Sequence, residues 1–90
     1  MSAKYVHVNK SLVLDNSLSD RARMVYVLIA ADESYPYVAI EEIAFTMGIN
    51  KGTIYKYVNE LIIAGWLTRR IIRNNGRVMA TEYTLKDEKA

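Results

Sequence analysis

Basic side chains are concentrated in one third of this chain of 90 residues. Residues 51–77 contain six lysines and arginines and a single acidic residue, so this segment carries a net charge of +5, whereas the whole chain carries +2. Ammonium and guanidinium groups gathered on one face are the electrostatic footprint of a surface that binds phosphates. A basic face that is only solvated and binds no ligand has the same composition. The secondary structure that positions these residues helps to decide between a phosphate-binding surface and a solvated face.

The first part of the basic segment has the periodicity of a helix over residues 51–64. Its apolar stripe consists of Ile54, Val58, Leu61 and Ile62. At about 100° per residue, the opposite face consists of Gly52, Lys56, Asn59 and Ile63, flanked by Thr53, Tyr55 and Glu60. A glycine so early in the helix either lets the backbone approach a ligand closely or is tolerated in a frayed first turn.

The remaining polar residues lack the spacing of catalytic or metal-binding sites. The chain has no cysteine, and its one histidine, His7, has no partner at metal-ligand spacing. No glycine loop that cradles phosphates and no serine nucleophile motif is present. We therefore expect no enzyme activity, cofactor, metal ion or small-molecule ligand. The longest apolar run, 24–31, is too short to span a membrane, and no signal peptide precedes it, which favours a cytoplasmic protein.

A tight turn precedes the basic helix. Gly48 can adopt the left-handed conformation that ends one helix, expected at 39–47, and Asn50 can cap the next. Ile49 and Ile54 are placed for a hydrophobic staple. Two helices joined this closely form a helix-turn-helix, whose second helix commonly enters the DNA major groove. The alternative is an ordinary pair of core helices.

An earlier helix is predicted to begin at the cap residue Ser19. Its core-facing residues follow the i, i+3, i+4, i+7 rule and are Ala22, Val25, Tyr26 and Ile29. Met24 and Val27 widen the apolar surface, so this helix is either buried on two sides or shared with a partner subunit in a homodimer. Residues 5–8 alternate weakly and predict a short edge strand, and 11–18 predict a loop with one helical turn.

Residues 67–85 predict a β-hairpin with its turn at Asn74-Asn75-Gly76. A two-residue loop would place Leu67 opposite Thr84. A three-residue loop would place Leu67 opposite Tyr83 and gather the apolar residues on one face, and we prefer this register. It also sets Arg73 opposite Arg77, an arrangement that a bound phosphate would stabilise.

Four segments resemble a known family, the winged helix-turn-helix domains at the N-terminus of phage and plasmid replication initiators and replisome organisers. They are LSDRARMVY (18–26), IAFTMGINKGTI (43–54), LIIAGWL (61–67) and TEYTL (81–85). Bacterial winged-helix transcription regulators are similar over 40–85. The resemblance implies an α+β fold with three helices and a C-terminal hairpin wing. It divides one domain, 1–90, into an N-terminal strand or arm (1–18), a three-helix core (19–65) with the helix-turn-helix at 40–64, the wing (66–85) and a tail (86–90).

In such families the second helix of the pair reads the major groove and the wing contacts the backbone or minor groove. Carried onto this chain, the base-facing residues are Thr53, Lys56 and Asn59. The phosphate-facing residues are Lys51, Gly52, Tyr55, Arg69, Arg70, Arg73 and Arg77. The function expected is sequence-specific binding of double-stranded DNA, in transcription regulation or in replication initiation. The alternative is a winged-helix docking or dimerisation module without direct DNA readout.

Overall fold

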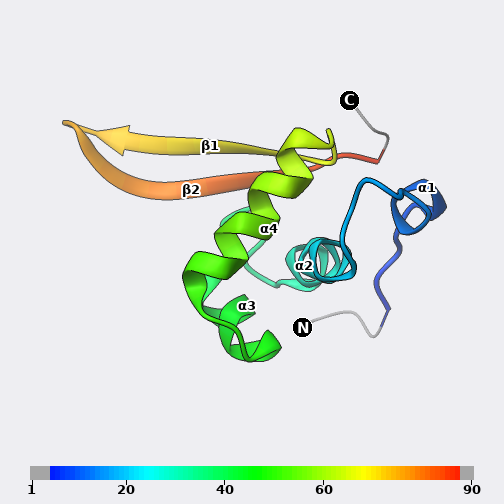
Figure 1. The fold of residues 1–90 in the computed structure, drawn as a ribbon. Coiled ribbons are helices and arrows are strands. Elements are labelled where there is room, and N and C mark those ends of the chain that lie inside the picture. Colours follow the sequence, from blue (N-terminus) through cyan, green and yellow to red (C-terminus); the bar gives the residue numbers. More distant parts are fainter. Residues whose placement is uncertain (1–4, 88–90) are drawn as a thin grey trace.

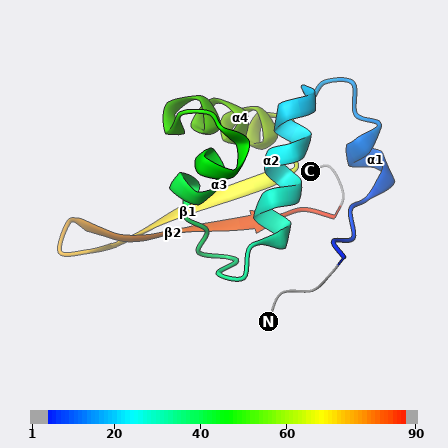
Figure 2. The same ribbon diagram turned by 90° about the horizontal axis from the view of Figure 1, so that it is seen from below.

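The computed structural model describes residues 5–87 and contains helices followed by a two-stranded antiparallel sheet (Figure 1). The elements, in chain order, are α1 (Lys10–Val13), α2 (Asp20–Ala31), α3 (Ile40–Met47), α4 (Lys51–Ile63), β1 (Leu67–Asn74) and β2 (Arg77–Leu85). The class is therefore α+β, as predicted. Helices α2, α3 and α4 form the body, and the hairpin projects from it as a long arm in both views (Figures 1 and 2).

Local sequence signals fix the ends of the helices. The side chain of Ser19 accepts from the backbone N of Ala22 at 3.2 Å, and that of Asn50 accepts from the backbone N of Thr53 at 2.9 Å. Each bond satisfies one backbone donor that a helix start leaves without a partner. Gly48 ends α3 with φ 67°, in the left-handed region that glycine enters without steric cost. The two predicted caps and the predicted turn are thus confirmed.

The core lies between α2, α3, α4 and the base of the hairpin. The four residues predicted to face inwards from α2 are all buried, as are the α4 residues Ile54, Val58 and Leu61. Trp66, just before β1, is 1% exposed and packs edge-on against Tyr26, with ring centroids 6.5 Å apart. Its indole N–H donates to Asp15 Oδ2 at 2.8 Å, which holds the segment before α2 against the core.

The predicted N-terminal strand is wrong within the described residues. Residues 5–9 form no strand, and residues 1–4 lie outside the described part. The short helix α1 agrees with the one helical turn predicted within 11–18, and it brings the helices of the described part to four. The outer edge of β2 is already occupied by the segment between α2 and α3. Tyr83 N donates to Pro36 O at 2.8 Å and Leu85 N donates to Tyr35 Oη at 3.0 Å. These bonds use the backbone donors that a third strand would have needed.

The preferred register of the hairpin is also wrong. Leu67 pairs with Leu85, and the tip has a two-residue loop at Asn75-Gly76, with Arg77 opposite Asn74. Asn75 and Gly76 have φ of 52° and 77°, the two positive values of the tight turn that suits strand twist. A bulge in the pairing opposite Ile72 and Arg73 then shifts the strands by one residue. The bulge allows this turn to coexist with the burial of Leu67 and Tyr83 at the base.

The predicted tail, 86–90, is described only to residue 87. Lys86 N donates to Trp66 O at 3.0 Å, which continues the pairing at the base of the hairpin. Asn9, the cap of α1, donates through its side chain to the backbone oxygen of Asp87. Residues 5–87 include no helix long and apolar enough to cross a membrane.

Candidate nucleic-acid interface

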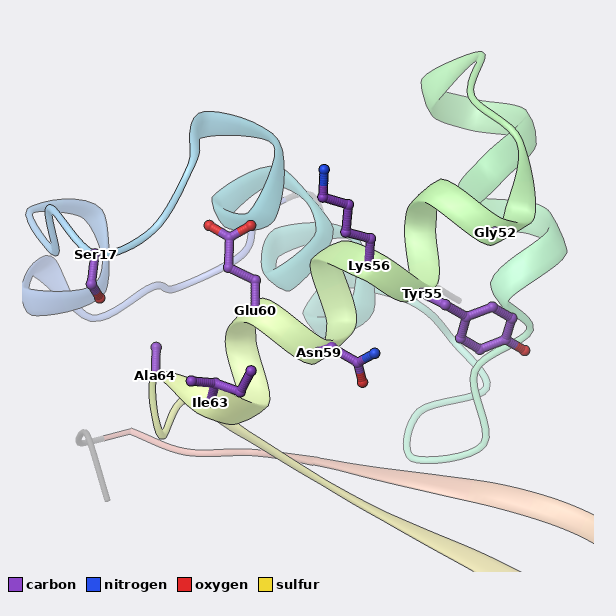
Figure 3. Close-up of a pocket in the computed structure, with 8 residues that line it drawn as sticks. All are labelled: Ser17, Gly52, Tyr55, Lys56, Asn59, Glu60, Ile63 and Ala64. Carbon is purple, nitrogen blue, oxygen red and sulfur yellow. The ribbon is translucent and has the colours of Figure 1, made fainter.

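The exposed side of α4 is the floor of an open groove of about 780 Å³ (Figure 3). The residues that line it are Ser17, Gly52, Tyr55, Lys56, Asn59, Glu60, Ile63 and Ala64. All but Ser17 come from α4 or its C-cap, so the groove follows the length of that helix. Ser17, from the loop before α2, donates through its N and Oγ to Asp15 Oδ1 at 2.9 and 2.6 Å.

Two of the three predicted base-facing residues lie in this groove, and the third lies beside it. Lys56 and Asn59 are exposed and line the groove. Both lie on the exposed face of α4, and their side chains point in different directions (Figure 3). Thr53 is half-buried and does not line it. The Thr53 hydroxyl donates to Asn50 Oδ1 at 3.1 Å, so it reinforces the cap of α4.

Gly52 leaves the start of the groove open. A Cβ at this position would lie 3.4 Å from Asn50 Oδ1, which is an ordinary contact. Crowding therefore does not require a glycine here, nor does a left-handed backbone, since residue 52 lies within α4. What the glycine does is expose the backbone of the first turn, where helix N–H groups favour anions. Tyr55, half-buried, lines the groove further along.

Lys51 is paired within the protein. Its ammonium lies 3.1 Å from Glu41 Oε1 of α3, and both side chains are more than half exposed. The pKa of Glu41 is lowered, first by a hydrogen bond from its own backbone N–H and then by Lys51, and the pKa of Lys51 is raised by the Glu41 carboxylate. A phosphate would therefore compete with this carboxylate for the ammonium of Lys51.

The four arginines of the hairpin have different surroundings. Arg70 lies 3.3 Å from Glu82, its partner across the strands, and Arg69 lies opposite the buried Tyr83. Arg73 lies opposite Val78 rather than opposite Arg77 as predicted. Because side chains alternate along a strand, Arg69 and Arg73 share one face of the hairpin and Arg70 the other, which Arg77 joins. The prediction that Arg73 and Arg77 face each other across the strands is therefore wrong, and so is the argument for a phosphate bound between them.

Four basic residues around the groove and the wing take part in no ion pair of the described residues. Among residues 5–87 the structure has three ion pairs, Arg23–Asp20, Lys51–Glu41 and Arg70–Glu82. The residues that belong to none of them are all exposed and are Lys56, Arg69, Arg73 and Arg77. The basic residues without an ion pair thus lie on the exposed face of α4 and along the hairpin, which projects from the body (Figures 1 and 2).

Residues 16–67 match the family described as a helix-turn-helix domain. This match covers more than half of the chain and includes all of α2, α3 and α4. The chain belongs to the helix-turn-helix domain family. Membership indicates DNA binding, and the hairpin that follows the helix-turn-helix is consistent with a winged helix. No curated protein and no solved structure matches the chain.

Sequence reasoning missed two features of this helix-turn-helix surface. The Lys51–Glu41 pair joins residues on two helices, and no rule of spacing along one helix would have found it. Glu60 lies in the groove, but its carboxylate accepts hydrogen bonds from the backbone N and the Oγ of Ser19 at 2.5 and 3.0 Å. The one acidic residue of the basic segment is therefore bound at the start of α2. A weak signal existed, because Ser19 has alanine three residues later where a capping box has an acid.

Proposed function

We propose that this chain binds double-stranded DNA sequence-specifically in the cytoplasm, with α4 in the major groove and the hairpin wing on the phosphate backbone. The observation that carries the proposal is the open groove along α4, with Lys56 and Asn59 exposed in it, next to a projecting hairpin with unpaired arginines. An α-helix with its side chains is about 10–12 Å across, which fits a major groove about 12 Å wide.

The side chains in the groove suggest which bases are read. Asn59 can donate to N7 and accept from N6 of adenine, and Lys56 can donate to O6 and N7 of guanine. Thr53, at the flank, offers its hydroxyl oxygen as an acceptor while it donates to Asn50. Phosphates would be held by the backbone at Gly52, by Tyr55 and by the basic residues Lys51, Arg69, Arg70, Arg73 and Arg77. These contacts set the register of the protein on DNA and carry no sequence information themselves.

Selection of bound sequences from random duplex DNA tests the proposal. Titration of the selected duplex and of the random pool, followed by fluorescence anisotropy, should give a Kd at least about 10³ lower for the selected duplex. Equal affinity for the two would reduce the function to non-specific binding, and no affinity at low salt would remove it. Asn59→Ala and Lys56→Ala should each cost about 1–3 kcal/mol on the selected duplex and far less on the pool.

The same selection separates the two biological roles that we propose, transcription regulation and initiation of phage or plasmid replication. A single inverted repeat would favour an operator, and an array of direct repeats would favour a replication origin. An inverted repeat with half-sites about one DNA turn apart would also favour a homodimer. The apolar side of α2 is the proposed dimer surface, where Met24 is 49% exposed and Val27 is half-buried.

A docking module without DNA readout is the second candidate. Phe45 of α3 is 88% exposed and lies on the same side of α3 as Glu41 and Glu42, outside the groove of α4. A bare aromatic ring is typical of a protein-binding surface. Sedimentation of the chain over a range of concentrations, with and without the selected duplex, distinguishes self-association from DNA binding. Association that is unaffected by Phe45→Ala and by Met24→Ala would exclude both of these surfaces.

A further inference from the structure

One apolar side chain stands at the C-terminal end of the polar face of α4. Ile63 is 86% exposed, although the other branched aliphatic residues of α4 are buried or half-buried. It lines the same groove as Lys56, Asn59 and Glu60. Full exposure of such a side chain to water forfeits a favourable burial of about 1.5–3 kcal/mol. An isoleucine here therefore has the chemistry of a contact residue rather than of a solvated surface residue.

The position of Ile63 on the helix is that of the other groove residues. Residues 52, 56, 59 and 63 follow each other at intervals of four, three and four, so they form one stripe at about 100° per residue. Asn59 and Ile63 are four residues apart and are neighbours on the helix surface. Figure 3 shows them on the same side of α4, on successive turns. A ligand that follows this face from Asn59 towards the C-terminal end of α4 also meets Ile63.

The chemistry of the DNA edge limits what can pack against this residue. Phosphates are charged, and the major-groove edges of the bases present hydrogen-bond donors and acceptors, apart from the C5 methyl group of thymine. We propose that Ile63 is a specificity-determining residue that packs on a thymine methyl group. This inference rests on the proposed function, and it adds a base preference that hydrogen-bonding residues of α4 do not supply.

The spacing within α4 predicts where this thymine lies. Four residues of helix rise by about 6 Å, and successive base pairs are about 3.4 Å apart. The thymine should therefore lie one or two base pairs from the adenine that Asn59 reads, on either strand. Ile63 is branched at Cβ and rotationally stiff, so holding it against the methyl group costs little side-chain entropy.

The experiment removes the methyl group from DNA and the side chain from the protein. The tightest duplex from the random selection is synthesised again with deoxyuridine in place of thymidine, one position at a time. Wild type, Ile63→Ala and Ile63→Val are titrated with each duplex, with Val13→Ala as the control that removes an exposed apolar side chain from α1. Ile63 is exposed, so its truncation leaves the core intact, which a thermal melt verifies.

We expect one or two deoxyuridine positions to weaken wild-type binding about fourfold, which corresponds to the roughly 0.8 kcal/mol of one buried methyl group. Ile63→Ala should bind the thymidine duplex more weakly and lose this sensitivity, whereas Ile63→Val and Val13→Ala should keep it. Equal sensitivity in wild type and Ile63→Ala would overturn the assignment, as would no sensitivity at any position. Dissociation of a dimer by Ile63→Ala with unchanged methyl sensitivity would assign the residue to a second copy of the chain instead.

The two proposals fail in different ways. Tight, selective binding of the selected duplex without a methyl effect leaves the proposed function standing and rejects the role of Ile63. Absence of any duplex with selective affinity rejects both.

Discussion

Glu60 of α4 completes the cap of α2. Its carboxylate accepts the backbone N–H of Ser19 at Oε1, at 2.5 Å, and the Ser19 hydroxyl at Oε2, at 3.0 Å, while the same hydroxyl accepts from Ala22 N at 3.2 Å. In a capping box an acid three residues after the cap makes the first of these bonds. Here a residue of another helix does so, and α2 is thereby locked to the helix that lines the groove.

Glu60→Ala should lower the free energy of unfolding by about 1 kcal/mol, because the cap residue loses its acceptor. For a domain of this size that corresponds to a fall in Tm of about 4–8 °C. The same variant should bind DNA more tightly, since it removes the one negative charge from the groove. Thermal denaturation and titration with duplex DNA measure the two effects. Glu33→Ala, which removes an exposed carboxylate from the turn after α2, is the control and should change neither quantity.

The ion pair between Lys51 and Glu41 restrains a cation at the start of α4. Glu41→Gln should release Lys51 for a phosphate, so we expect higher affinity for DNA and a slope of log K against log salt that is steeper by roughly 0.9. Titrations at several salt concentrations give the slope. Glu42→Gln removes the same charge from the next position of α3, and it should leave the slope unchanged. An equal response of the two variants would mean that only the net charge of α3 matters.

The local features of this fold could be predicted and the non-local ones could not. The cap residues Ser19 and Asn50 and the left-handed Gly48 act within a few residues of the chain, so their types alone indicated the helix ends. The apolar spacing of α2 likewise identified its buried side. In contrast, the bulge of the hairpin depends on the burial of Leu67 and Tyr83 together with the turn at its tip, a compromise that no short segment encodes.

The candidate site also has features that local sequence predicts and features that it does not. The exposed face of α4 followed from helix periodicity, which places Lys56 and Asn59 on one stripe of the helix. Helix periodicity did not show which basic residues form ion pairs, because Lys51 pairs with Glu41 of another helix and Arg70 pairs with Glu82 of the neighbouring strand. Four basic residues around the groove and the wing are left without ion pairs, and counting charges along the sequence could not identify them.

The wing arginines Arg73 and Arg77 lie on opposite faces of the hairpin, so they should contact separate phosphates. Each single alanine substitution should reduce the slope of log K against log salt by roughly 0.9, and the double substitution by roughly twice as much. The effects should add, because the side chains share no partner. Lys10→Ala removes a charge from α1 and should leave the slope unaltered. A double variant with the wild-type slope would show that the wing does not touch DNA.

Two buried tyrosines link the stability of the fold to alkaline pH. Burial raises the pKa of Tyr26, whose hydroxyl donates to Lys86 O at 2.8 Å, and burial also raises the pKa of Tyr83, where Arg69 opposes the shift. The ordinary value is 10.0. Above that pH the unfolded chain releases protons that the folded chain keeps, so stability falls as pH rises. Below pH 10.0 the protonated tyrosines make their full contribution to the free energy of unfolding. That contribution is lost as the pH rises through the raised pKa values of the folded state.

Urea unfolding between pH 7 and pH 11 measures this linkage, and replacement of both residues isolates it from the titration of lysines. The variant with Tyr26→Phe and Tyr83→Phe should be less stable at pH 7, by about 1 kcal/mol for the hydrogen bond to Lys86. Its free energy of unfolding should then decline less steeply above pH 10.0 than that of the wild type. Tyr37→Phe, at a half-exposed position, is the control and should keep the wild-type slope. Parallel curves for the double variant and the wild type would mean that other groups cause the alkaline loss of stability.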